Sequence, residues 1–261
     1  MPTASLAIPS GLRAIVTAGA GGIGRAIVDA LLAHGARVQI CDIDAEALAG
    51  FRAIRPAAGA TLADVAEEAD VARLFADAAA QLGGLDLLVN NAGIAGPTGA
   101  VEAIMPDDWR RCIDVGLTGQ FLCTRLAVPL LKAAGGGAIV NLSSAAGRFG
   151  YAWRTPYAAA KWGVIGFTQS LAKELGPSNI RVNAILPGIV AGPRITRVIA
   201  ARAQQEQVSY AAMEKTYLDR VSLRRMVTAE DVAGTVLWLV SAVGANISGQ
   251  SLGVDGNVES L

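Results

Sequence analysis

Short apolar runs rich in β-branched residues alternate with longer segments rich in Ala and Leu along most of the chain. The runs predict strands at residues 14–17, 37–41, 61–65, 85–89, 138–142, 181–186 and 251–254. Between them, apolar positions at helical spacing predict helices, for example over residues 23–34, 71–82 and 157–175. This alternation predicts an α/β fold with a doubly wound parallel sheet and helices on both faces.

The alternation contains no linker rich in Pro, Gly or Ser and no internal repeat, so we expect a single domain over residues 1–261. Residues 188–226 differ from the rest, because this segment is long, rich in Arg and Gln, and helical in pattern without a strand. The segment follows the sixth predicted strand, and open α/β sheets bind ligands beyond the carboxyl ends of their strands. We therefore interpret residues 188–226 as a substrate lid.

Composition and charge indicate what kind of molecule the chain binds. Hydrophobic residues make up 52% of the 261 residues, charged residues make up 17%, and the formal net charge is +0. Such a chain offers no broad basic surface to nucleic acid or to an anionic membrane, which favours a small-molecule partner. Cys41, Cys112 and Cys123 are widely spaced within apolar segments. Together with the lack of a signal peptide and of a membrane-spanning stretch, they indicate reduced thiols in a cytoplasmic protein.

A glycine-rich loop follows the first predicted strand and leads into a helix, with the sequence Thr17-Ala18-Gly19-Ala20-Gly21-Gly22-Ile23-Gly24-Arg25. Glycines allow the backbone to turn sharply and to approach a pyrophosphate, whose negative charge is favourable at a helix N-terminus. The alternative is a tight turn without a ligand. The strand before the loop and the helix after it favour phosphate binding.

Asp42 ends the second predicted strand and is the candidate ligand of an adenosine ribose. A carboxylate at this place accepts hydrogen bonds from both ribose hydroxyls and repels a 2′-phosphate. Gly21 also leaves the loop without a basic side chain for such a phosphate. Both features favour NAD over NADP. The alternative is that Asp42 caps the helix that begins near Asp44.

Tyr157 and Lys161 form the candidate catalytic pair. Residues four apart share one face of a helix. A fixed ammonium beside a phenol favours the phenolate and lowers its pKa, so that Tyr157 can exchange protons with a substrate oxygen. The single histidine, His34, falls at a predicted helix end. A surface helix with an ordinary side-chain pair is the alternative, and no metal site is predicted.

Seven motifs in order give the chain a resemblance to the short-chain dehydrogenase/reductase family, from about Leu12 to Asn257. They are the loop Thr17–Gly24, Asp64-Val65, Asn90-Asn91-Ala92-Gly93, Ser143-Ser144, Tyr157-x-x-x-Lys161, Pro187-Gly188 and Val254-Asp255-Gly256. The resemblance implies a Rossmann-type fold, a nicotinamide cofactor, interconversion of alcohol and carbonyl groups, and a homotetramer.

The resemblance also implies roles for individual residues. Tyr157 would be the general acid/base, Ser144 would hydrogen-bond the substrate oxygen, and Lys161 would bind the nicotinamide ribose and lower the tyrosine pKa. The implied cofactor-binding residues are Gly19, Gly22, Ile23, Gly24, Asp42, Asp64, Val65, Asn91, Ala92, Gly93, Tyr157, Lys161, Pro187, Gly188, Ile189 and Val190. Asp64 and Val65 would hold the adenine, and the segment from Pro187 would hold the nicotinamide carboxamide.

Three positions depart from the family pattern. Ala18 replaces the first glycine of the loop, and an alanine at negative φ would cost nothing there, so we expect a slight reshaping with binding retained. Gly192 replaces a common threonine and removes one possible hydrogen bond to the carboxamide. Gly116 replaces an asparagine that completes the family's catalytic set and helps to hold a water in a proton relay to the lysine. We expect a slower or differently hydrated relay in an active enzyme.

Arginines near the predicted pocket suggest the kind of substrate. Guanidinium groups at Arg148, Arg154 and Arg194 would bind a carboxylate, as in a hydroxy or keto acid such as a deoxy sugar acid. Alternatively, these arginines face solvent, and aromatic residues of the 149–153 segment line a pocket for neutral cyclic substrates. Two further possibilities remain, a 3-oxoacyl thioester reductase, which Asp42 disfavours, and an NAD(H)-binding sensor without turnover. The exact substrate, its stereochemistry and the physiological direction stay open.

Overall fold

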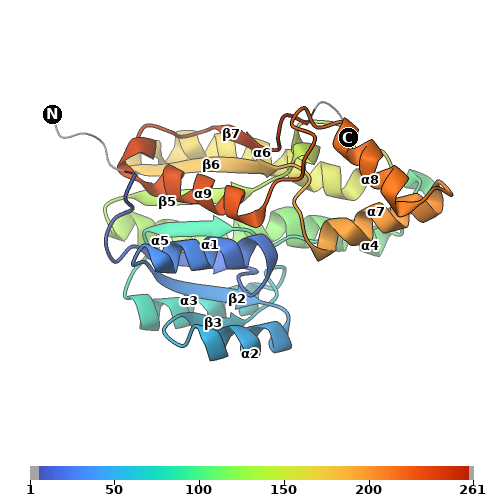
Figure 1. The fold of residues 1–261 in the computed structure, drawn as a ribbon. Helices are drawn as coiled ribbons and strands as arrows, with labels where there is room; N and C mark the ends of the chain where they lie inside the picture. Colours follow the sequence, from blue (N-terminus) through green and yellow to red (C-terminus); the bar gives the residue numbers. More distant parts are fainter. Residues whose placement is uncertain (1–5, 259–261) are drawn as a thin grey trace.

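The computed structural model describes residues 6–258, and a seven-stranded parallel sheet runs through this part of the chain (Figure 1). The strands lie in the order β3-β2-β1-β4-β5-β6-β7. They are β1 (Arg13–Thr17), β2 (Arg37–Asp42), β3 (Gly59–Leu62), β4 (Leu87–Asn90), β5 (Gly137–Leu142), β6 (Ile180–Pro187) and β7 (Ser251–Val254). Every neighbouring pair is parallel.

Helices cover both faces of the sheet. One face carries α1 (Gly22–Ala33), α2 (Ala45–Ile54) and α9 (Ala229–Val240), and the other carries α3 (Glu68–Leu82), α5 (Gly119–Ala133) and α6 (Thr155–Leu175). The prediction of a doubly wound, Rossmann-type parallel sheet is confirmed. The third strand was predicted at residues 61–65 and ends instead at Leu62, because the Asp64 carboxylate accepts a hydrogen bond from Ala66 N and starts a turn.

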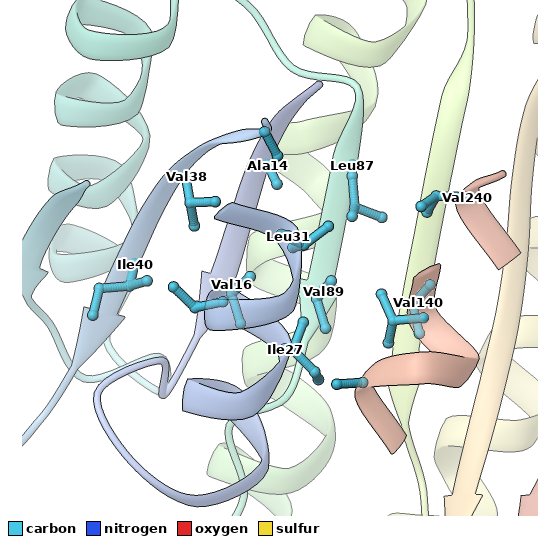
Figure 2. Close-up of a cluster of buried hydrophobic side chains, with 14 of the residues drawn as sticks. Ala14, Val16, Ile27, Leu31, Val38, Ile40, Leu87, Val89, Val140 and Val240 are labelled. Atoms are coloured by element: carbon cyan, nitrogen blue, oxygen red, sulfur yellow. The ribbon is translucent and has the colours of Figure 1, made fainter. Parts of the chain in front are cut away.

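Alternating strand residues build the two cores. Ala14 and Val16 of β1 point to the face of α1, whereas Ile15 between them points to the face of α3 and α5. Figure 2 shows Ile27 and Leu31 of α1 over the strand side chains of β1, β2 and β4. Both faces are buried, so the inner positions of the central strands, residues 14–16 of β1 and 87–89 of β4, are apolar, as the continuous runs in the sequence predicted.

The strand order reverses between β1 and β4, and this reversal positions the candidate site. The loop after β1 leads outward to β2, and the loop after β4 leads to the other half of the sheet, so the two loops diverge at the carboxyl edge. Helices α7 (Pro193–Gln205) and α8 (Tyr210–Asp219) follow β6 and lie beyond this edge, near α4 (Pro106–Ile113) (Figure 1). No helix within residues 6–258 is long and apolar enough to span a bilayer.

The three cysteines are buried and form no disulfide. Burial raises the pKa of the Cys41 thiol to about 12, and it also raises the pKa of Cys112 and of Cys123. Because the thiolate is the reactive form, these three side chains act as small apolar groups of the core.

Ala18 does not adopt the conformation that the sequence led us to expect. Its φ is +50°, in the left-handed region, and not the negative value at which alanine costs nothing. A non-glycine residue there costs about 1–2 kcal/mol. Ala18 therefore stores strain at the start of the glycine-rich loop, where its carbonyl accepts a hydrogen bond from Asn91 Nδ2 at 3.1 Å.

We expect Ala18→Gly to stabilise the protein by up to about 1 kcal/mol, since the strain relieved exceeds the entropic cost of glycine. The measurement is the midpoint of urea unfolding without cofactor. Ala20→Gly is the matched control, because Ala20 lies in the same loop and is not among the positive-φ residues. Ala20→Gly should lower the urea midpoint slightly. Equal effects of the two substitutions would contradict the assignment of strain to Ala18.

Candidate active site

Helix α6 carries Tyr157 in its first turn and Lys161 one turn later. Pro156 occupies the start of the helix, where its missing N–H leaves no bond unmade. The Lys161 side chain lies inside the protein, with the residue only 4% exposed, and its Nζ donates to the Leu142 carbonyl at 2.7 Å. The same nitrogen lies 5.8 Å from the centre of the Tyr157 ring. The structure thus brings the two predicted residues together at the carboxyl edge of the sheet.

The end of β5 adds two serines with different functions. Ser143 Oγ donates to the Lys161 carbonyl at 2.8 Å and fixes α6 against the strand. Ser144 Oγ accepts a hydrogen bond from Ala146 N at 3.2 Å, so its own proton remains available for another oxygen. That hydroxyl also contributes to lowering the pKa of the Tyr157 phenol. Ser144, Tyr157 and Lys161 therefore form one connected group.

The electrostatic surroundings favour an ionised Tyr157. Burial alone would raise the pKa of this phenol, but the charges of Lys161 and Arg194 lower it, and smaller contributions come from the Ser144 hydroxyl and from Arg154. The net effect is a pKa of Tyr157 below its usual value. For Lys161 burial is the largest effect, and it lowers the pKa of the ammonium. The pKa values of the phenol and of the ammonium are thus both lowered, and perturbed pKa values of this kind cluster at functional sites.

The glycine-rich loop is held by side-chain hydrogen bonds from the end of β4. Asn91 Nδ2 donates to the carbonyls of Thr17 and Ala18 at 3.0 and 3.1 Å. The Thr17 hydroxyl accepts from the backbone N–H groups of Asn91 and Ala92, both at 2.9 Å. Gly24 fits closely here, because a Cβ at this position would collide with the Ala18 carbonyl oxygen. The two loops that diverge at the sheet reversal are thereby joined.

Asp42 lies beside this loop. One of its carboxylate oxygens accepts from Ala20 N at 3.2 Å and the other accepts from Asp44 N at 3.2 Å. The N-cap of α2 is Asp44, which accepts from two backbone N–H groups of the first turn, so the capping function belongs to Asp44 and not to Asp42. Exposed Ile43 and Leu62 flank the ends of β2 and β3.

Asp64 pairs with a residue that the sequence did not single out. Its carboxylate accepts from Arg111 Nη2 of α4 at 2.6 Å, and its backbone N–H donates to Asp70. The Asp64-Val65 turn is therefore fixed by α4 as well as by α3.

The segment after β6 is fixed by strand-like bonds. Val227 N donates to the Ile189 carbonyl and Ala191 N donates to the Val227 carbonyl, each at 2.9 Å. Gly188 N donates to the Val254 carbonyl at 3.0 Å. The bridge between Val190 and Val227 uses neither the N–H nor the C=O of Val190. Gly192 then begins α7 with φ +144°, a conformation unsuited to the threonine common in the family.

The three predicted arginines occupy different environments. Arg154 is buried, its guanidinium lies 5.1 Å from the Tyr157 ring, and its Nη2 donates to the Ala95 carbonyl at 2.6 Å. Arg194 is exposed and lies 5.8 Å from the same ring, with Nη1 donating to the Gly93 carbonyl at 3.4 Å. Arg148 is exposed, and its side chain makes no hydrogen bond or ion pair within residues 6–258. The structure thus places Arg154 and Arg194, but not Arg148, against Tyr157.

The lid helices contact this group through tyrosines. Tyr151 lies 5.2 Å from the Arg154 guanidinium, and its hydroxyl is 3.4 Å from that of Tyr217 in α8. A pocket lies between residues 151–152 and the helices α7 and α8, and Arg202, Met213 and Tyr217 contribute to its lining. The contact joins α8 to the loop that precedes α6.

Thr17, Arg111 and Gln120 are site residues that the sequence analysis missed. Each acts through a partner at least 22 residues away along the chain, on another element of the fold. The only sequence signal for Thr17 is its place at the start of the glycine-rich loop. No motif indicates Arg111 or Gln120.

Comparison with known proteins identifies the family. Residues 18–258 match the family model described as enoyl-(acyl carrier protein) reductase. The chain therefore belongs to the short-chain dehydrogenase/reductase family, and this prediction is confirmed.

Two curated relatives and one solved structure cover nearly the whole chain. 2-Dehydro-3-deoxy-L-rhamnonate dehydrogenase (NAD(+)) of Sphingomonas sp. (strain SKA58) is 37% identical over 232 residues, 89% of each chain. Cis-4-hydroxycyclohexanecarboxylate dehydrogenase of Sinomonas cyclohexanicum is 39% identical over 246 residues, 93% of this chain and 94% of the relative. NAD+-bound xylitol dehydrogenase has a TM-score of 0.90 at 28% identity, covering 95% of this chain and 98% of its own.

Arg194→Gln should move the pH dependence of alcohol oxidation to higher pH. Oxidation needs the phenolate as base, a neighbouring cation favours the phenolate, and removal of that cation raises the pKa of Tyr157. The measurement is kcat against pH. Arg197→Gln is the matched control, since Arg197 is also exposed on α7 and does not act on the Tyr157 pKa. An unchanged profile in Arg194→Gln would exclude this contribution.

Proposed function

We propose that this chain is an NAD-dependent dehydrogenase that interconverts a secondary alcohol and a ketone, with a substrate that carries a carboxylate. The observation that carries the proposal is the connected group of Ser144, Tyr157 and Lys161, with a phenol whose pKa is lowered, at the carboxyl edge of the sheet. Relatives named as dehydrogenases over about nine-tenths of the chain support the reaction class. A cofactor-binding sensor would need no such acid/base group.

The residues at the sheet reversal fit NAD. The loop before α1 has glycines at Gly21 and Gly22, where an added Cβ would meet no atom within 4 Å, so a phosphate has open access to the helix N-terminus. Asp42 offers its carboxylate beside the loop for the adenosine ribose, and Ile43 and Leu62 offer apolar walls to the adenine. The unused N–H and C=O of Val190 would hold the carboxamide, and Lys161 would hold the nicotinamide ribose. When bound, the cofactor supplies the acceptor or donor of the hydride.

Side chains of the protein transfer the proton of the reaction. In alcohol oxidation, the Tyr157 phenolate accepts the hydroxyl proton of the substrate, while Ser144 Oγ–H donates to the same oxygen and fixes its position. Lys161 stabilises the phenolate before the transfer by its charge. In ketone reduction the same phenol returns the proton. Binding and orientation limit the reaction to an oxygen that reaches both hydroxyl groups.

Arg154 and Arg194 are our candidates for binding the substrate carboxylate, because both guanidinium groups lie next to Tyr157. Arg154 Nε is buried and has no hydrogen-bond acceptor among residues 6–258. Both curated relatives bear names of carboxylic acids, a rhamnonate and a cyclohexanecarboxylate, which supports a hydroxy or keto acid. A neutral polyol is the second candidate, favoured by the similarity to xylitol dehydrogenase.

The lid, the assembly and the location belong to the same proposal. Residues 188–226 would close over the substrate, with α8 reaching the 151–154 loop through Tyr217. Phe121 on α5 and Trp162 on α6 are about half exposed, and burial between copies of the chain would stabilise a homo-oligomer, a tetramer by family resemblance. A cytoplasmic location agrees with three unpaired cysteines.

The reaction is tested by absorbance at 340 nm with NAD or NADP against hydroxy acids, sugar acids and neutral cyclic alcohols. We expect turnover with NAD on an acid, and a loss of at least about a hundredfold in Tyr157→Phe, as removal of a general base produces. Asp42→Ala should weaken NAD binding and improve the use of NADP, because the carboxylate no longer repels the 2′-phosphate. Tight NADH binding without turnover on any compound would favour the sensor.

Substitution of the arginines tests the substrate class. Arg154→Gln and Arg194→Gln should each raise KM for the acid about tenfold or more, the size expected for loss of a charged hydrogen bond, and change KM for a neutral alcohol little. Arg148→Gln is the comparison, since this exposed arginine lies away from Tyr157. Equal KM changes for acid and neutral substrates would argue for a purely structural function of these arginines.

A further inference from the structure

Gln120 is a buried polar residue that the reaction outlined above does not use. It lies in the first turn of α5, is 3% exposed, and donates from Nε2 to the Leu142 carbonyl at 3.2 Å. The Leu142 carbonyl also accepts from Lys161 Nζ at 2.7 Å. Gln120 and Lys161 therefore meet at one carbonyl oxygen, each approaching from a different helix.

The other end of the Gln120 amide has no partner. Its Oε1 is buried and accepts no hydrogen bond from any atom of residues 6–258. The amide orientation is fixed, because only the nitrogen can donate to the Leu142 carbonyl. A buried acceptor without a donor is unfavourable. A hydrogen-bond donor between this oxygen and the Lys161 ammonium would therefore be stabilising.

The residue one turn before Gln120 has no side chain and packs against α6. Gly116 lies in a π-helical segment, Asp114–Thr118, that leads into α5. A Cβ at Gly116 would lie 3.1 Å from the Cβ of Ala160, the residue directly before Lys161. Gly116 thus faces the turn of α6 that holds the lysine, and its missing side chain leaves the Gln120 amide as the polar group of α5 at this level.

The polar surface of α5 continues inward from Gln120. Thr124, one turn later, accepts from Asn90 Nδ2 at 3.1 Å. Asn90 Nδ2 also donates to Asn141 Oδ1, and Asn141 Nδ2 donates to Thr168 of α6, both at 2.9 Å. These side chains are buried, and Asn90 Oδ1 is another acceptor without a donor among the residues that the structure describes. The space between α5 and α6 is therefore polar enough to hold ordered water.

We propose that Gln120 is a positioning residue for Lys161 and acts through a bridging water. This water donates a hydrogen bond to Gln120 Oε1 and accepts one from Lys161 Nζ. An ammonium has three donors, and one of them is used by Leu142. The bridging water satisfies a second donor and leaves the third for the ribose that the proposed function places there. The inference deepens that function, and its kinetic consequence rests on it.

The consequence is an ammonium that keeps its charge in spite of burial. Burial lowers the pKa of Lys161, and the charged groups facing the pair are Arg194 of α7 and Arg154 at the start of α6, with the Cys112 thiol of α4 nearby. Loss of the water would lower the pKa of Lys161 further. A neutral lysine no longer favours the phenolate, so the pKa of Tyr157 would rise.

The test uses Gln120→Met, which keeps the shape of the side chain and removes both polar atoms. Titration of Tyr157 without cofactor is followed by tyrosinate absorbance, as the difference between each protein and its Tyr157→Phe counterpart. We expect the midpoint of the Tyr157 titration to move to higher pH. We expect kcat near neutral pH to fall about tenfold, which is part of the effect of general acid–base catalysis. The Kd of NADH should change less than twofold. Gln120→Leu replaces Gln120→Met if the latter does not fold.

Gln39→Met is the matched control. Gln39 is a buried glutamine of β2 whose Oε1 also has no partner within the described part of the chain, and its Nε2 donates to Thr61, away from α6. Gln39→Met should lower thermal stability without moving the pH midpoint of the Tyr157 titration. An unmoved midpoint in Gln120→Met, or an equal shift in both variants, would overturn the inference. Absence of turnover in the unaltered protein would instead overturn the proposed function, while the titration would still decide the part played by Gln120.

Discussion

Lys161 is only 4% exposed, so its ammonium has lost most of its hydration and must be compensated by the protein around it. Lys161 obtains this compensation from the Leu142 carbonyl and from the Tyr157 phenol, which raises the lysine pKa as the lysine lowers that of the phenol. The position of α6 against β5 follows from the same need, because Ser143 fixes the helix at the Lys161 carbonyl. The position of α6 and the proposed chemistry therefore both involve one buried charge.

The parallel sheet brings the remaining parts of the site to this charge. The carboxyl ends of β1, β4, β5 and β6 supply the glycine-rich loop, the Asn91 segment, the two serines and the Pro187 segment. Side chains then join neighbouring loops, as Asn91 does with Thr17 and Ala18. Each loop is held by a strand that is buried on both faces, so the positions of the polar groups are fixed by the apolar core.

The departures from the family pattern are local and have different physical meanings. Ala18 keeps the left-handed backbone of a glycine and stores strain, Gly192 adopts a backbone conformation that its glycine permits, and Gly116 removes a side chain from a π-helical turn against α6. None of them disturbs the group formed by Ser144, Tyr157 and Lys161. They alter the surroundings of the candidate acid/base residues and leave those residues in place.

The sequence by itself determined the sheet, the site residues to be considered and the family. Seven apolar runs predicted seven strands, because parallel strands buried on both faces are apolar over most of their length, and motif order predicted the family. Only the tertiary structure decided which polar groups meet. It showed that Arg154 faces Tyr157 while Arg148 is exposed, that Asp44 and not Asp42 caps α2, and that Gln120 shares a carbonyl with Lys161. The periodicity of a segment reports which face of it is buried. Hydrogen bonds between residues far apart in the chain depend on the packing of whole elements, which no local pattern encodes.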